Sequence, residues 1–126
     1  MPPLNFEYEE IAGRFYPIVP VELVSSEKNI LTRAYVDSGA TFSIFNSEIA
    51  EYLGIDYLKG EKIFPAGIGG HICAYLNDII LVVGGMEIPC KVLFSEEFVI
   101  KFNLVGRAGV FDKFKVCFDD AERVVE

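Results

Sequence analysis

A single carboxylate lies between two apolar, strand-like runs in the stretch "AYVDSGATFSIF", residues 34–45. The first run is apolar throughout, and the second alternates apolar and polar residues as a β-strand does. Asp-Ser-Gly is also a common turn composition, and it could simply join two strands of a hairpin. A surface hairpin rarely has such apolar flanks. We therefore expect Asp37 to end a buried strand at the floor of a concave site, where an ionised group costs free energy unless it is hydrogen-bonded or used.

Short strand-like runs separated by regular turn signals predict a mainly β domain. Residues 14–24 predict an edge strand, because Pro17 and Pro20 each remove a ladder donor. Further strands are expected at 30–36, 61–66, 73–83, 86–94, 98–106 and 115–120, with a short helical or turn segment at 106–114.

One short amphipathic helix is predicted between Asn46 and Gly54. Asn46 is a favourable N-cap, and Gly54 is a typical helix stop. The spacing of Ile49, Tyr52 and Leu53 puts these side chains on one face.

Length and charge limit the classes of protein that this chain can represent. A chain of 126 residues forms one domain. Its hydrophobic content of 52% fits either a rich core or an apolar surface covered by a second copy. The formal net charge is −8 and no window collects basic residues, so we expect no nucleic-acid partner.

The three cysteines, Cys73, Cys90 and Cys117, are widely and irregularly spaced. This spacing suggests neither a disulfide framework nor a zinc site, and it fits buried free thiols in a reducing cytosol. Residues 1–10 lack the features of a signal peptide, and no run approaches transmembrane length. We therefore expect a soluble cytoplasmic protein with no membrane partner.

The glycine cluster "GIGGHI", residues 67–72, has neither the lysine of a P-loop nor a G-x-G-x-x-G spacing. Its glycines could serve only a turn conformation, or they could form a mobile hairpin that approaches an extended ligand closely. His71 is the only histidine, and we expect it on the surface of this hairpin. A two-histidine metal site is therefore excluded.

Three motifs in chain order resemble those of the retropepsin-like aspartic proteases, which are single-domain relatives of retroviral protease that work as homodimers. "YVDSGA" at 35–40 looks like the active-site loop, "GIGG" at 67–70 like the flap tip, and "NLVGR" at 103–107 like the segment before the C-terminal helix. The resemblance covers roughly residues 15–119. The chain end "GRAGVFDKFKVCFDD" is more similar to cellular, prokaryotic-type members than to viral ones.

The resemblance implies a closed β-barrel-like acid protease fold with one or two short helices. It also implies an aspartic endopeptidase acting on a peptide or protein substrate as a homodimer, with no cofactor and no metal. The implied catalytic residues are Asp37, Ser38 and Gly39. The implied substrate-binding residues are Ala40, Gly67, Ile68, Gly69 and Gly70.

The sequence departs from the family pattern around a late arginine. Viral members commonly carry an acidic residue where Thr41 stands and an acidic residue or amide where Ala108 stands. These departures leave the partner of Arg107 unidentified.

The chemistry of peptide hydrolysis explains why one motif implies two chains. One carboxylate cannot act as base and acid at once, whereas two that share a proton can. Because the chain has a single Asp-Ser-Gly, the second carboxylate must come from a second subunit. In this dimer Ser38 would hydrogen-bond across the axis, Gly39 would leave room for a substrate backbone, and Ala40 would keep the floor small.

Two other interpretations stay open. One is a catalytically inactive retropepsin-like module that dimerises and binds peptides, and the other is a plain β domain. The expected organisation is an N-terminal tail or dimer arm at 1–13, the protease domain at 14–120, and a C-terminal tail at 121–126.

Overall fold

The computed structural model describes residues 4–26, 28–65, 72–97 and 103–126, and it is mainly β. The strands are β1 (Phe6–Glu7), β2 (Glu9–Ile11), β3 (Arg14–Tyr16), β4 (Ile18–Ser25), β5 (Lys28–Val36), β6 (Ile44–Asn46), β7 (Glu61–Ile63), β8 (Ala74–Val83), β9 (Met86–Ser95), β10 (Asn103–Val105), β11 (Phe118–Asp119) and β12 (Val124–Val125). The helical elements are α1 (Ser47–Leu53), η1 (Tyr57–Lys59) and η2 (Arg107–Phe111).

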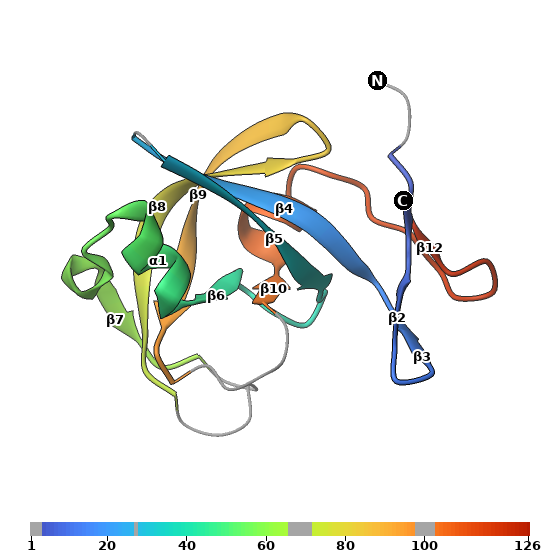
Figure 1. Ribbon diagram of the computed structural model, residues 1–126, viewed down its shortest axis with the longest axis horizontal. Coiled ribbons are helices and arrows are strands. Elements are labelled where there is room, and N and C mark those ends of the chain that lie inside the picture. Colours follow the sequence, from blue (N-terminus) through green and yellow to red (C-terminus); the bar gives the residue numbers. More distant parts are fainter. Residues whose placement is uncertain (1–3, 27, 66–71, 98–102) are drawn as a thin grey trace.

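Six strands close into a barrel (Figure 1). They follow the order β4, β5, β10, β6, β9 and β8, and β8 pairs back with β4 at residues 22–24. Strand β10 runs parallel to β5, and β6 runs parallel to β9. The predicted mainly β, closed-barrel fold class is therefore confirmed.

The prediction of an edge strand at 14–24 is wrong, because β4 has neighbours on both sides at its C-terminal end. Pro20 is tolerated for a local reason. Hydrogen-bonded and non-hydrogen-bonded residue pairs alternate along an antiparallel ladder. Because the Val36 amide donates to the Pro17 carbonyl, that pair is hydrogen-bonded, and the pair of Pro20 with Arg33 is therefore a non-hydrogen-bonded one that needs no donor from Pro20 toward β5. The pairing with β8 begins only at Glu22, so Pro20 lacks no ladder bond on that side either.

The predicted helix is confirmed as α1. Its N-cap is Asn46, whose side chain accepts a hydrogen bond from the Glu48 amide at 2.8 Å, and Gly54 ends it with a left-handed φ of 76°. Leu53 is buried as expected. Tyr52 is not, since 53% of its surface is exposed, and Lys28 lies over its ring.

Alternation along the central strands divides their side chains between two apolar clusters. The larger cluster fills the barrel and includes Val36, Phe45, Phe94 and Val105. The smaller cluster lies on the opposite face of these strands. Its buried members are Ile44, Ala74, Leu93 and Leu104, and the partly buried Tyr35, Phe42, Ile63, Ile72 and Leu76 pack against them.

The two ends of the described chain meet in a separate sheet of order β1, β12, β11, next to the hairpin β2–β3. Figure 1 shows these strands together at one end of the molecule, beside the barrel. The strand expected at 115–120 is limited to Phe118–Asp119. The segment expected as a polar tail from residue 121 contains β12, in which Val125 is only 3% exposed because it packs into the core. A single chain does not test the dimer-arm prediction for residues 1–13.

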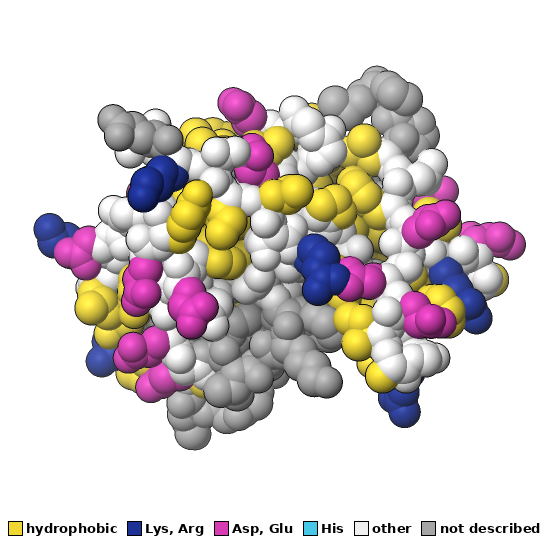
Figure 2. All heavy atoms as spheres, viewed as in Figure 1, with side chains coloured by type: hydrophobic (Ala, Val, Ile, Leu, Met, Phe, Trp, Pro, Cys, Tyr) yellow, Lys and Arg dark blue, Asp and Glu magenta, His cyan; other side chains and the backbone are white. Residues whose placement is uncertain are grey.

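The predicted helical or turn segment at 106–114 corresponds to η2, whose backbone is non-helical at Ala108 and Gly109. Among the described residues, no helix has the length and apolar character that crossing a membrane requires. On the face drawn in Figure 2, acidic side chains are widely spread and the Lys and Arg side chains are dispersed among them.

Candidate active site

The loop that follows β5 carries Asp37 and is fixed to the segment after β10. The Asp37 amide donates to the Val105 carbonyl at 3.0 Å, which continues the parallel β5–β10 ladder by one residue. Further along, the Arg107 amide donates to the Ala40 carbonyl and the Ala108 amide to the Thr41 carbonyl, each at 2.9 Å. These hydrogen bonds to the barrel strands fix the position of the loop, and with it the backbone of Asp37.

A buried serine completes this attachment. Ser43 is 0% exposed, and its hydroxyl accepts a hydrogen bond from the Gly106 amide at 3.0 Å. Gly106 packs directly under the loop, because a Cβ there would lie 2.6 Å from the Ala40 carbonyl oxygen and 2.8 Å from that of Phe42. Only glycine fits between these two backbone segments without displacing one of them.

The Asp37 carboxylate is held by its own loop. Its Oδ1 accepts a hydrogen bond from the Gly39 amide at 2.8 Å, and the Ala40 amide donates to the Asp37 carbonyl at 3.2 Å. A Cβ on Gly39 would lie 3.2 Å from this same Oδ1, so glycine here gives the carboxylate room. The Oδ2 atom makes no hydrogen bond within the described part of the chain.

Asp37 and Ser38 line a hollow of about 510 Å³ between the barrel and the terminal strands. Phe15, Phe118 and Arg123 contribute to its walls, and the Arg123 guanidinium stacks over the Phe15 ring at 3.6 Å. The carboxylate thus faces an open, partly aromatic space.

Two tyrosines in this hollow have perturbed pKa values. Burial, followed by the nearby Asp37 carboxylate, raises the pKa of Tyr35. Burial and a 2.7 Å hydrogen bond donated to Asp120 raise the pKa of Tyr8 to about 12. Both hydroxyls therefore stay protonated at neutral pH, and the single O–H donor of Tyr8 is used by Asp120.

No protein-family model and no curated protein matches the chain. Solved structures do match it. A retropepsin-like aspartic protease from Rickettsia conorii is 20% identical, with a TM-score of 0.66 over 98% of both chains. A protease of EIAV, solved with an inhibitor, is 19% identical, with a TM-score of 0.56 over 79% of this chain and 88% of the other. The chain has the retropepsin-like fold.

Within this retropepsin-like fold, the predicted catalytic residues lie together on one loop. Asp37 is half-buried, Ser38 and Gly39 are exposed, and Ala40 is 8% exposed beneath them. The Ser38 hydroxyl has no hydrogen-bond partner in the part of the chain that the structure describes. The predicted flap residues Gly67, Ile68, Gly69 and Gly70, and His71 with them, lie outside the described residues.

Arg107 is exposed and forms no ion pair within the described residues, so its side-chain partner is still unassigned. Its backbone amide has the structural role, through the bond to Ala40. In the retropepsin-like fold of this chain, the loop therefore depends on the backbone of the 105–108 segment.

Sequence reasoning missed the role of Ser43. The available signal was a polar residue inside the apolar run "FSIF", at a position where alternation allows either face. It also did not predict the hydrogen bond from the Gly39 amide to the Asp37 carboxylate, and the role of Gly39 in leaving room for a substrate stays a prediction.

The expected burial of the thiols is wrong in part. Cys73, Cys90 and Cys117 are all free, but Cys117 is exposed and the other two are half-buried. In the described part of the chain, no three His, Cys, Asp or Glu side chains gather closely enough to hold a metal ion.

Proposed function

We propose that the protein is an aspartic endopeptidase that works as a homodimer, with Asp37 supplying one catalytic carboxylate from each chain. The observation that carries this proposal is the Asp37 loop. It lies at the end of a barrel strand of a retropepsin-like fold, and four backbone and side-chain hydrogen bonds attach it to the core. Its Asp37 side chain lines a hollow, and within the described residues one oxygen of that carboxylate makes no hydrogen bond.

The reaction needs a second carboxylate close to the first. Two such groups cannot both ionise comfortably, so the pair keeps one proton, as in known aspartic proteases. The ionised member takes a proton from the attacking water, and the protonated member polarises the scissile carbonyl. A second copy related by a two-fold axis beside Asp37 supplies this group.

The substrate we infer is an extended peptide with apolar side chains near the scissile bond. Tyr35 lies near the end of β5, and Asp37 directly follows that strand and continues its pairing with β10, so the two side chains are directed to the same face. Leu104 is the register neighbour of both Tyr35 and Ile44, which extends an apolar row from Asp37 across the sheet. Gly67, Ile68, Gly69 and Gly70 would close over this row as a flap, and Ala40 would keep its floor small.

The terminal sheet supports the dimer part of the proposal. Within the described residues, β1 and β11 are its edge strands, and each leaves a row of backbone groups that a second copy could pair with. The net charge of −8 opposes association, so moderate salt should favour the dimer by screening. The free thiols fit a cytoplasmic location.

Asp120 provides a matched control for the catalytic assignment, since it lines the same hollow as Asp37. Asp37→Asn keeps the shape of the side chain and removes the base, so it should abolish cleavage of a peptide library at mildly acidic pH. Asp120→Asn should retain cleavage. Near wild-type cleavage by folded Asp37→Asn would eliminate the aspartic mechanism, and loss of cleavage only in Asp120→Asn would move the chemistry to another carboxylate.

Association state separates the enzyme from a plain domain. Specific activity should fall when the protein is diluted through its dimer dissociation constant, because each monomer carries half a site. Sedimentation velocity beside a fluorogenic peptide assay measures this. A dimer that binds peptides without cutting them would instead support the inactive binding module.

A further inference from the structure

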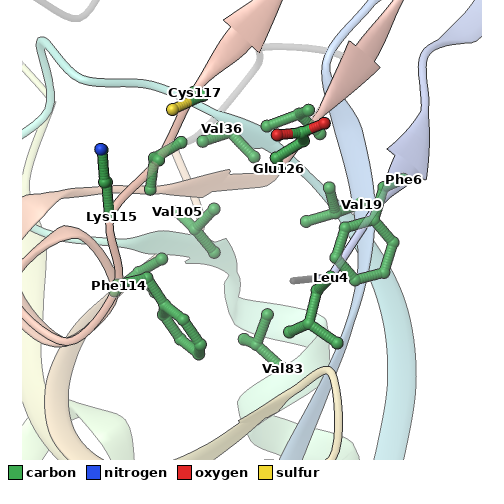
Figure 3. A pocket seen from close by; sticks show the side chains of 13 residues that line it. Leu4, Phe6, Val19, Val36, Val83, Val105, Phe114, Lys115, Cys117 and Glu126 are labelled. Carbon is green, nitrogen blue, oxygen red and sulfur yellow. The ribbon is translucent and has the colours of Figure 1, made fainter. Parts of the chain in front are cut away.

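A second cavity, of about 380 Å³, lies between the barrel and the terminal sheet. Val36 and Val105 contribute barrel walls, Phe6 and Val125 come from the terminal strands, and Phe114 comes from the segment after η2. Figure 3 shows the side chains of Leu4, Val83 and Phe114 directed toward its centre. Its only residue in common with the hollow at Asp37 is Val36, so the two spaces are separate.

The lining of this cavity is mainly hydrocarbon. Its ionisable side chains are Lys115, Cys117 and Glu126. In Figure 3 Lys115 lies to the left of the cavity centre, Cys117 and Glu126 lie above it, and the Lys115 amine points away from the centre. Among the described residues, every buried side-chain nitrogen or oxygen already has a hydrogen-bond partner. An ordered water molecule needs polar groups to hydrogen-bond with, and the cavity interior provides few of them. The interior therefore favours an apolar occupant.

The cavity is large enough for a small ligand. Apolar cavities of about 150 Å³ bind benzene, and ligand pockets generally begin at about 300 Å³. A volume of about 380 Å³ accommodates a monocyclic aromatic or a short aliphatic molecule. The interior holds no buried charge to recognise an ionic ligand.

The walls of the cavity also hold Asp37. Val36 directly precedes it, and the Val105 carbonyl accepts the Asp37 amide at 3.0 Å. A ligand that packs against both valines contacts the strand pair that sets the start of the active-site loop. A ligand at these valines would therefore lie one backbone residue away from Asp37.

We propose that this cavity is a binding site for a small neutral apolar molecule, and that its occupancy alters the environment of Asp37. The site is independent of catalysis, so its existence does not depend on the proposed peptidase activity.

The test is a titration of the full chain with toluene, followed by amide and methyl NMR. Saturable shifts are expected at Val36, Val105 and Phe6, and at the amides of Asp37 and Gly39. Benzoate, which has a similar shape and a charge, should produce weaker shifts. Asp37→Asn should bind toluene like the wild type, which separates this test from that of the peptidase.

Variants at half-buried valines show whether the shifts report the cavity. Val116→Phe fills it from the irregular segment before β11 and should weaken toluene binding about tenfold or more, because the vacant volume is lost. Val24→Phe makes the same change on a half-buried valine outside the cavity and should leave binding unchanged. Val116→Lys, which introduces a charge at the same wall, is the second variant if Val116→Phe does not fold.

Several outcomes would overturn the proposal. Toluene shifts that survive both Val116 variants would place the ligand elsewhere. Stronger binding of benzoate than of toluene would make the site anionic. Shifts at the lining residues that follow protein concentration and not toluene would show that a second copy fills the cavity. Shifts confined to the lining, without change at Asp37 and Gly39, would remove the link to the active-site loop.

Discussion

Replacing Gly106 by alanine tests the contact between the active-site loop and the barrel. A Cβ at Gly106 would meet three backbone atoms within 3.0 Å, namely the Ala40 oxygen at 2.6 Å, the Phe42 oxygen at 2.8 Å and the Phe42 carbon at 2.9 Å. Gly106 has extended backbone, with φ −116° and ψ −164°, which any residue can adopt. The destabilisation by Gly106→Ala is therefore steric. The clashing atoms belong to the backbone, which cannot relieve the clash by changing rotamer as a side chain can.

The size of the effect follows from these contacts. Overpacking costs about 1–3 kcal/mol, and three simultaneous backbone contacts place Gly106→Ala near the upper value, at about 3 kcal/mol. Alanine also lowers the conformational entropy of the unfolded chain, which offsets up to about 1 kcal/mol of this destabilisation. A net loss of about 2 kcal/mol lowers the Tm of a domain of this size by about 8 °C. Displacement of the loop should also reduce peptide cleavage, because Asp37 moves with Ala40 and Phe42.

Thermal unfolding and peptide cleavage should be measured together, with Gly85→Ala as the control. Gly85 has a φ of 84° and open space around its missing Cβ, so alanine there strains the β8–β9 turn without touching the Asp37 loop. Gly85→Ala should lower the Tm and keep the activity of the folded protein, whereas Gly106→Ala should lower both. A Gly106→Ala protein with wild-type Tm and cleavage would refute the inferred packing of loop on strand.

Three further predictions concern local contacts. Ser43→Ala leaves the buried Gly106 amide without its acceptor, so denaturant unfolding should show a loss of about 1–3 kcal/mol, and an unchanged midpoint would contradict the role given to this serine. Asn46→Ala removes the α1 cap and should cost about 1 kcal/mol with cleavage retained, so lost cleavage in the folded variant would show that α1 acts on the site. The pKa of Tyr8 is raised from 10.0 to about 12, so its contribution to the unfolding free energy is full below pH 10.0 and is lost as pH rises toward about 12. Tyr8→Phe should lessen that alkaline loss, and identical pH profiles for the two proteins would contradict it.

Local signals in the sequence were sufficient for the features that depend on neighbouring residues. Asn46 and Gly54 bracket α1 because capping requires only adjacent backbone. Asp37 was located because a carboxylate between apolar strands is unusual wherever the strands pack.

The features that depend on distant pairing were not predictable in this way. Strand β4 was predicted to be an edge strand because Pro17 and Pro20 each lack a donor, but a proline excludes a hydrogen bond only at its own position. The pairing of β4 with β8 joins segments far apart in the chain, so the local sequence does not indicate it. The pairing of β1 with β12 likewise joins the two ends of the described chain. Ser43 is a polar residue inside an apolar run, but alternation alone allows it either face, so its hydrogen bond with Gly106 could not be predicted before the position of Gly106 was known.

The most direct test of the shared active site is a subunit-mixing experiment. Wild-type protein and Asp37→Asn protein are mixed in varying ratio at constant total concentration, equilibrated under conditions that allow subunit exchange, and assayed for peptide cleavage. If each site needs one Asp37 from each chain, mixed dimers are inactive, and an equal mixture should retain about one quarter of the wild-type activity. Retention of about one half, in proportion to the wild-type fraction, would show that each chain works alone and would contradict the two-chain site.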